Sequence, residues 1–224
     1  MLKKVMILIL SLVGLVLLFA SCISIGGNQI RGTGQVVSRT MDVDEFDSID
    51  VSGNFVIVYR QSSEMALTIT MQENLFDHLN VNTRNGTLTV GSRRGFDTST
   101  ANRPRMYVYA PYLVSADFSG AVNASDWDNI EVERFVLDIS GAASVNFGLY
   151  VERLDIDASG AASITLWGSA NNIDINGSGA LNIRATDLEI EGGSVDVSGA
   201  ANVTLSTLEN VNVRSSGVAR VREG

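Results

Sequence analysis

The sequence predicts an all-β protein, specifically a right-handed parallel β-helix (a β-solenoid) with about 18–21 residues in each rung. The first observation behind this prediction is a Ser-Gly motif, usually followed by alanine, that recurs along the chain. Its serines are Ser119, Ser140, Ser159, Ser178, Ser198 and Ser216, at intervals of 21, 19, 19, 20 and 18 residues. A period of this length is typical of one supersecondary unit stacked on itself.

The second observation is the alternation of apolar and polar residues on both sides of each motif. Leu154 and Ile156 precede Ser159 in this pattern, and Ile164 and Leu166 follow it. Period-two alternation is the pattern of a half-buried strand. Each rung is therefore expected to contain two strands around one tight corner, with a looser third side. Helix signals are nearly absent, and residues 74–79 are the only short candidate.

The glycine of each motif is interpreted as the corner residue. Glycine adopts backbone angles closed to other residues, so the chain can bend sharply between two strands. Its small neighbours let successive corners stack at the strand spacing of about 4.8 Å. These structural turn residues are Gly120, Gly141, Gly160, Gly179, Gly199 and Gly217. The recurrence argues against a nucleophilic serine, because a catalytic serine is needed only once.

The region before residue 113 is less regular, but its elements can still be assigned. Residues 46–59 alternate on both sides of Ser52-Gly53 and are interpreted as a degenerate first rung. Residues 67–71 and 106–109 alternate as strands, and Asn85-Gly86 predicts a hairpin. Residues 91–104 are mostly polar and are expected to form a loop.

The N-terminus has the pattern of a bacterial lipoprotein. Lys3 and Lys4 precede an apolar run over residues 5–20, and Cys22, the only cysteine, follows two small residues. Residues 1–21 are interpreted as a signal peptide, 22–34 as a flexible tether and 35–224 as one solenoid domain. Cys22 would carry the lipid. An ordinary signal peptide or an uncleaved membrane helix is the alternative.

The charge of the mature chain argues against nucleic acid as a partner. Removal of the signal leaves 14 arginines against 25 acidic residues, a net charge of 14 − 25 = −11. Neutralisation of phosphates by basic residues supplies most of the affinity for nucleic acid.

The chain resembles the bacterial head GIN domain family, a family named for auto-transporter adhesins and otherwise of unknown function. The resemblance rests on the opening at residues 46–54, Asn85-Gly86, the step at Ala110-Pro111 and the series of Ser-Gly turns. It covers nearly all of the mature chain. It implies a secreted or lipid-anchored β-helical protein and offers no catalytic motif.

A column of carboxylates is the main candidate for a ligand or metal face. Stacked rungs would bring together outward-facing aspartates, namely Asp138, Asp155, Asp157, Asp174 and Asp196. Because like charges on neighbouring strands destabilise a sheet, the column needs a reason. A bound calcium ion would offset this repulsion, since Ca²⁺ takes several oxygen ligands. The alternative is a solvated acidic face that needs no cofactor.

Enzyme signals are weak, and no catalytic residue is assigned. His78 is the single histidine and has no nucleophile beside it in the sequence. We expect a non-enzymatic lipoprotein of the bacterial envelope, at the outer membrane or cell surface or facing the periplasm. It would act as an adhesin-like or scaffolding module on a glycan or surface protein, or as a homo-oligomer. The alternative is a Ca²⁺-dependent glycan binder or a polysaccharide-active enzyme, with the aspartates and Arg134, Arg153 or Arg184 as its site.

Overall fold

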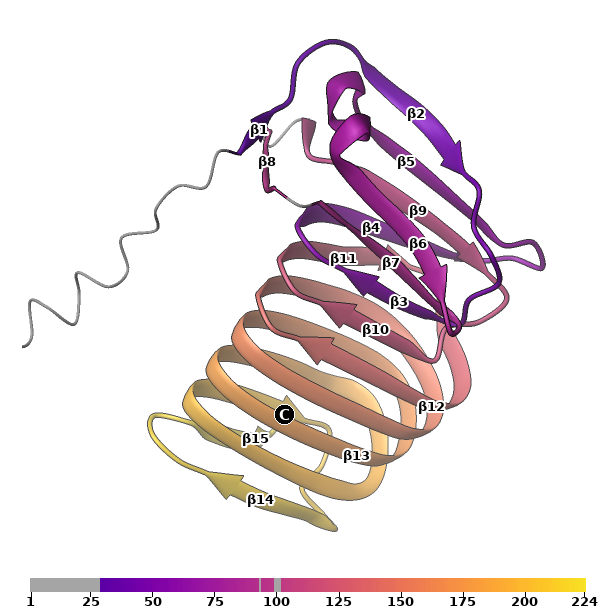
Figure 1. The fold of residues 1–224 in the computed structure, drawn as a ribbon. Helices are drawn as coiled ribbons and strands as arrows, with labels where there is room; N and C mark the ends of the chain where they lie inside the picture. The colour runs from indigo at the N-terminus through magenta and orange to yellow at the C-terminus, as the bar shows by residue number, and fades with distance from the viewer. Residues whose placement is uncertain (1–28, 93, 99–101) are drawn as a thin grey trace, which may run out of the picture.

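The computed structural model describes residues 29–92, 94–98 and 102–224, and within them the protein is all-β, as predicted. The expected signal peptide and Cys22 lie outside these residues. One large sheet curls round until it is nearly closed, and a two-stranded sheet lies beside its N-terminal end (Figure 1). No helix in the described residues is long and apolar enough to cross a membrane.

The N-terminal part of the protein holds the antiparallel strand pairs of the described residues. Its elements are β1 (Ile30–Arg31), β2 (Val36–Met41), β5 (Ala66–Gln72), the 3₁₀ helix η1 (Glu73–His78), β6 (Leu79–Arg84), β7 (Thr87–Ser92), β8 (Phe96–Asp97) and β9 (Arg105–Ala110). β5 pairs antiparallel with β2 and β9. β6 and β7 form the predicted hairpin, and Asn85 and Gly86 at its turn have φ of 52° and 77°. The short helix falls where the sequence placed its only candidate.

Two features of this part differ from expectation. β1 lies inside residues 22–34, the stretch interpreted as a tether, so ordered structure begins before Gln35. β1 pairs in parallel with β8, which lies inside the expected loop at 91–104. A two-residue strand has too few positions to show period-two alternation, so neither pairing partner had a sequence signal.

The rest of the chain winds in successive turns (Figure 1). Its strands are β3 (Ser48–Val51), β4 (Asn54–Gln61), β10 (Ser115–Phe118), β11 (Ala121–Trp127), β12 (Ile130–Ile139), β13 (Ala142–Leu205), β14 (Val211–Ser215) and β15 (Arg220–Glu223). Each turn pairs in parallel with the next, as in Phe118 with Ile139 and Ile139 with Ala158. β3 and β4 pair with β10 and β11, so residues 46–59 do form a first turn.

The third side of the turns is more regular than predicted. Strand pairing continues through it, and Ile130 pairs with Leu149 and Arg134 with Arg153. Leu149 and Leu188 are fully or almost fully buried there. These apolar side chains give the third side a buried face of its own. The sequence did not predict a regular strand there, because the spacing of these residues varies between turns.

The corner glycines stack directly on one another. A Cβ atom on Gly160 would lie 2.5 Å from the carbonyl oxygen of Gly141, and one on Gly199 would lie 2.7 Å from that of Gly179. Real Cβ atoms essentially never approach a backbone oxygen below 3.0 Å. The corners therefore need glycine because of close approach between turns. Gly160 also has φ of +123°, a region that disfavours other residues.

Candidate functional site

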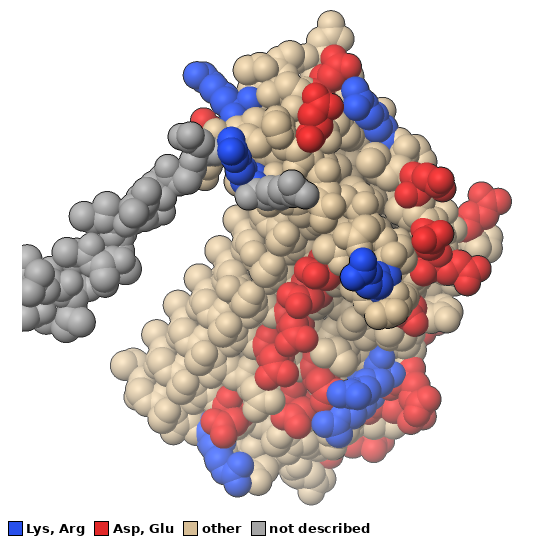
Figure 2. All heavy atoms as spheres, in the orientation of Figure 1, with Lys and Arg blue, Asp and Glu red and all other residues tan. Residues whose placement is uncertain are grey.

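The aspartate column is the in-register row formed by Asp50, Asp117, Asp138 and Asp157. Parallel pairing places Asp117 between Asp50 and Asp138, and Asp138 between Asp117 and Asp157. Figure 2 shows a line of acidic atoms that runs down the coil. Of the five aspartates predicted to face outward, Asp138 and Asp157 are in register in this row.

A shallow groove of about 470 Å³ follows the aspartate column toward the C-terminal end of the coil. Beyond Asp157 it is lined by Asn176 and Asp196, and the motif serines at positions 140, 159 and 178 form part of its surface. Asp196 pairs in register with Arg214 on β14. The side chain at this position is therefore negatively charged up to Asp196 and positively charged in the next turn.

Burial and mutual repulsion weaken the acidity of the middle of the column. Burial raises the pKa of Asp117, and the carboxylates of Asp50 and Asp138 raise it further. Burial likewise raises the pKa of Asp138, with Asp157 adding to the effect. Both causes disfavour the charged form, so protonation of these two groups favours the folded state.

We expect Asp138→Asn to stabilise the protein at pH 7 by about 0.5 kcal/mol, the size of one like-charge pair across strands. The raised pKa means that the folded state binds a proton more tightly than the unfolded state. This group's contribution to stability therefore falls as pH rises through the raised pKa and is fully lost above it. Urea unfolding at acidic and neutral pH should show a smaller loss of stability with rising pH in the variant.

Asp196→Asn is the matched control, because Asp196 faces Arg214 instead of another carboxylate. Its loss should leave stability unchanged or slightly lower at pH 7. If Asp138→Asn were as destabilising as this control, repulsion along the aspartate column would not be significant.

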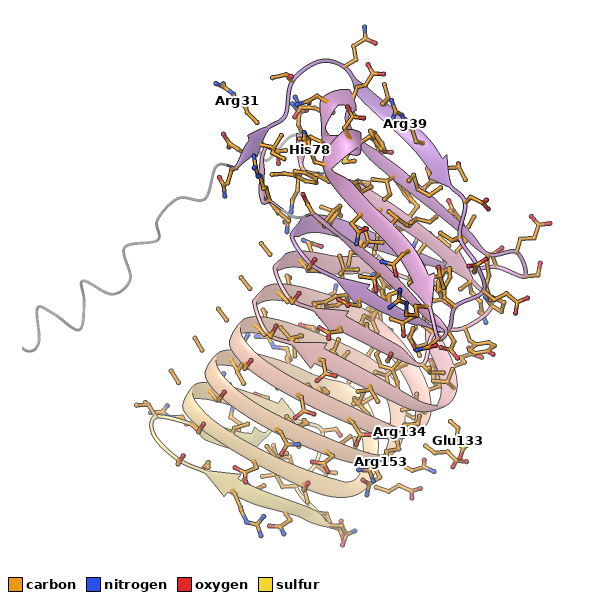
Figure 3. All side chains as sticks on the ribbon, viewed as in Figure 1. Arg31, Arg39, His78, Glu133, Arg134 and Arg153 are labelled. Carbon is orange, nitrogen blue, oxygen red and sulfur yellow. The ribbon has the colours of Figure 1, made fainter. Side chains whose placement is uncertain are left out.

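Asp155 and Asp174 belong to a separate network that includes two arginines. Asp155 accepts hydrogen bonds from Nε of Arg134 at 2.6 Å and Nε of Arg153 at 2.8 Å, and its side chain is only 12% exposed. Asp174 accepts one from Ser194 at 3.0 Å and pairs with Arg153 at 3.5 Å. Figure 3 shows Arg134 and Arg153 side by side on the coil. Both carboxylates therefore make side-chain hydrogen bonds that link neighbouring turns of the coil.

The structure therefore divides the five predicted aspartates into two groups. Asp138, Asp157 and Asp196 line the groove, whereas Asp155 and Asp174 are bound by arginines. Among the described residues, no three or more His, Cys, Asp or Glu side chains are arranged to hold a metal ion. A cation at Asp155 would have to displace both arginines.

The column also contains two aspartates that were not predicted as site residues, Asp50 and Asp117. The signal for Asp50 was present in the sequence, since it stands two residues before Ser52-Gly53, as Asp117 does before Ser119-Gly120. The six Ser-Gly motifs from which the repeat was recognised begin at Ser119, so they do not include the first turn.

The histidine and the aromatic residues lie away from the column. His78 ends η1 at the N-terminal part of the sheet (Figure 3). Trp127 is 7% exposed and packs inside the coil, so it offers no surface for a ligand. Tyr150 and Trp167 are partly exposed, at 47% and 36%.

The fold and the groove together define an all-β domain with a row of carboxylates along its parallel turns. Over residues 45–223 the chain matches the family model described as "Putative auto-transporter adhesin, head GIN domain". The protein belongs to this family, as the sequence resemblance indicated.

Solved structures of similar fold support the assignment of the architecture. A "putative adhesin" from Bacteroides fragilis has a TM-score of 0.70 at 16% identity, with 87% of this chain and 100% of that chain covered. A "putative lipid binding protein" from Parabacteroides distasonis has 0.63 at 14%, with 88% and 100% covered. A "putative adhesin" from the same species has 0.60 at 20%, also with 88% and 100%. No curated protein matches the chain. At these identities the likeness concerns the fold alone.

Proposed function

We propose that the protein is a non-enzymatic, adhesin-like module of the bacterial envelope that binds a glycan or surface protein through the outer faces of its coil. The observation that carries this proposal is the parallel register, which places aspartates at the same position in successive turns, as in Asp117, Asp138 and Asp157. Such a surface offers repeated weak contacts, which add to one firm attachment when the binding partner also repeats. The adhesin-type family and neighbours support this reading.

The coil itself is, in this proposal, a right-handed parallel β-solenoid. Its support is the parallel pairing of successive turns, together with the stacked glycines at their corners. Stacked turns of this kind make a rigid body, because each turn is hydrogen-bonded to both neighbours.

A lipid on Cys22 would fix this body to a membrane. The lipobox-like pattern ends at Cys22, and the first strand begins soon after it at Ile30. Each buried methylene adds about 0.8 kcal/mol of membrane affinity, so two or more acyl chains anchor a protein stably. Anchoring through the N-terminus would place the antiparallel strands nearer the membrane and leave the coil accessible.

Expression of the full chain in a bacterial host that processes lipoproteins tests both parts of the proposal. We expect acyl chains on Cys22 of the wild-type protein from the membrane fraction, measured by mass spectrometry, and none on Cys22→Ser, because the serine cannot take the thioether-linked lipid. Membrane vesicles that carry the wild type should adhere to at least one surface in a panel of glycans and matrix proteins.

The two measurements test lipid anchoring and adhesion independently of each other. Wild-type protein that stays soluble, or that carries no acyl chain on Cys22, would contradict lipid anchoring. Anchored vesicles that adhere no better than vesicles from the empty host would contradict the adhesive function.

A further inference from the structure

The side of the coil that ends in β15 (the β15 side) differs in composition from the rest of this acidic protein. Its outward positions are the fourth and sixth residues after each motif serine, because the residues that alternate with them, such as Ile183 and Val203, are buried. The chain has 25 Asp and Glu residues, yet none of them stands at these positions. The positions hold only hydroxyl, amide and guanidinium groups, and the last three turns carry Asn182, Arg184, Asn202, Thr204, Arg220 and Arg222.

The strand register brings three arginines together at the C-terminal end of the β15 side. β15 pairs in parallel with the end of β13, with Arg222 beside Thr204. The stacked corner glycines place Arg184 at the same position one turn before Thr204. Arg184 and Arg222 are thus two turns apart, about 10 Å, and Arg220 lies about 7 Å from Arg222 along one strand. These three residues form the arginine cluster.

The guanidinium groups of the arginine cluster are open to solvent and have no acidic partner in the described part of the chain. All three residues are exposed. The ion pairs among the described residues are made by other arginines. Nε of Arg222 donates to Oγ1 of Thr204 at 3.2 Å, a bond that holds the side chain across the β15 side and uses neither terminal nitrogen. Because three neighbouring cations repel one another, an anion bound between them would relieve this repulsion.

We propose that the β15 side binds an acidic glycan, with the arginine cluster on the carboxylate or sulfate groups of the sugar chain. The planar fork of arginine binds such oxyanions through two parallel hydrogen bonds. The amide and hydroxyl groups of the same side can donate to and accept from the sugar hydroxyls between the charged groups. This inference rests on the proposed adhesive function, since it names the class of glycan that such a module would bind.

Two other polyanions fit the β15 side less well than an acidic glycan. Nucleic acid is bound through many phosphate contacts, whereas the cluster supplies three arginines on a chain of formal net charge −9. A membrane surface is bound through exposed apolar side chains together with basic ones, and no outward position of the β15 side holds a large apolar residue. A sugar chain needs neither, because hydroxyl and amide contacts complement the three charges.

Isothermal titration of the full chain, solubilised in an uncharged detergent without a sugar headgroup, tests the proposal. The probes are polygalacturonate, which carries carboxylates, dextran sulfate, and neutral dextran as the uncharged reference. We expect at least one acidic glycan to bind and dextran not to bind. The triple variant Arg184→Gln, Arg220→Gln and Arg222→Gln should bind that glycan at least about tenfold more weakly, because it removes the charge-assisted hydrogen bonds.

A second triple variant, Arg31→Gln, Arg84→Gln and Arg105→Gln, is the matched control. It changes the net charge by the same amount, at exposed arginines of the N-terminal part of the protein. It should keep nearly all of the affinity, because charges far from the ligand are screened by salt. Arg184→Gln alone breaks no side-chain hydrogen bond of the described residues and should weaken binding at an unchanged melting temperature. A folding defect of the first triple variant would then not account for its loss of binding.

The proposal is overturned if no acidic glycan binds, if the first triple variant binds as well as the wild type, or if the control variant loses as much affinity. Double-stranded DNA or phosphatidylglycerol vesicles that bind as tightly as the glycan, with the same loss in the first triple variant, would overturn the choice of a glycan. Adhesion of membrane vesicles that persists in the first triple variant would leave the adhesive function intact and place its ligand elsewhere.

Discussion

Gly160→Val is expected to cost at least about 3 kcal/mol of unfolding free energy, because it introduces two separate faults at one corner. The new Cβ atom would lie 2.5 Å from the carbonyl oxygen of Gly141 in the preceding turn. The backbone φ of +123° is in addition one that a β-branched residue rarely adopts. Unfolding in guanidinium chloride, followed by circular dichroism, should show a clear fall in the midpoint.

Two other glycines separate the two faults. Gly34 has φ of +83° but nothing within 4 Å of an added Cβ, so Gly34→Val tests backbone strain alone. Gly141 has no positive φ, yet an added Cβ would collide with the carbonyl oxygen of Gly120, so Gly141→Ala tests the close approach alone. We expect the second loss to be larger than the first. A Gly160→Val protein as stable as the wild type would contradict stacking of the corners.

The repeating part of the fold could be predicted because its contacts follow the sequence period. Residues that pair, such as Phe118 and Ile139, stand at the same distance from their own Ser-Gly motif. A strict one-dimensional repeat therefore gives the strand register directly. The same reasoning recovers the aspartate column, including Asp50 once the first turn is added.

The arginine contacts of Asp155 could not be predicted in this way. In the register Asp155 stands beside Val136 of the preceding turn, and the repeat pattern therefore places no arginine next to it. Arg134 reaches it diagonally from two positions earlier in the preceding turn. Long side chains make such diagonal contacts according to their rotamers, which the sequence pattern does not specify.

The small sheet formed by β1 and β8 was not predictable from the sequence for a different reason. β1 and β8 are two residues each, and they are far apart in the chain. Gln72 ends a strand with ordinary alternation, and only the position of Gly32 against it shows that its amide is buried. Non-local packing of this kind has no periodic signal.

Trp127→Ala is expected to cost about 3–5 kcal/mol, the range for removing a large aromatic side chain from a core. Trp127 stacks on Phe147 with ring centroids 4.9 Å apart and an angle of 11° between the planes. Phe118 meets it edge-on at 6.1 Å, and Tyr59 lies 5.7 Å away. The four rings come from β4, β10, β11 and β13, so the substitution would open a cavity where the first turns of the coil meet.

Comparison with two further variants assigns this loss to packing or to hydrogen bonding. Trp127 Nε1 donates to the carbonyl of Ile57 at 3.0 Å, so Trp127→Phe keeps most of the aromatic contact but leaves that buried oxygen without its side-chain donor. It should cost about 1–3 kcal/mol.

Trp167→Ala removes a partly exposed indole and should cost less than about 1 kcal/mol. Equal losses for Trp127→Ala and Trp167→Ala in urea unfolding would mean that the aromatic cluster does not join the first turn to the rest of the coil. The expected order, with Trp127→Ala largest, instead follows from β11, which pairs with β4 on one side and β13 on the other.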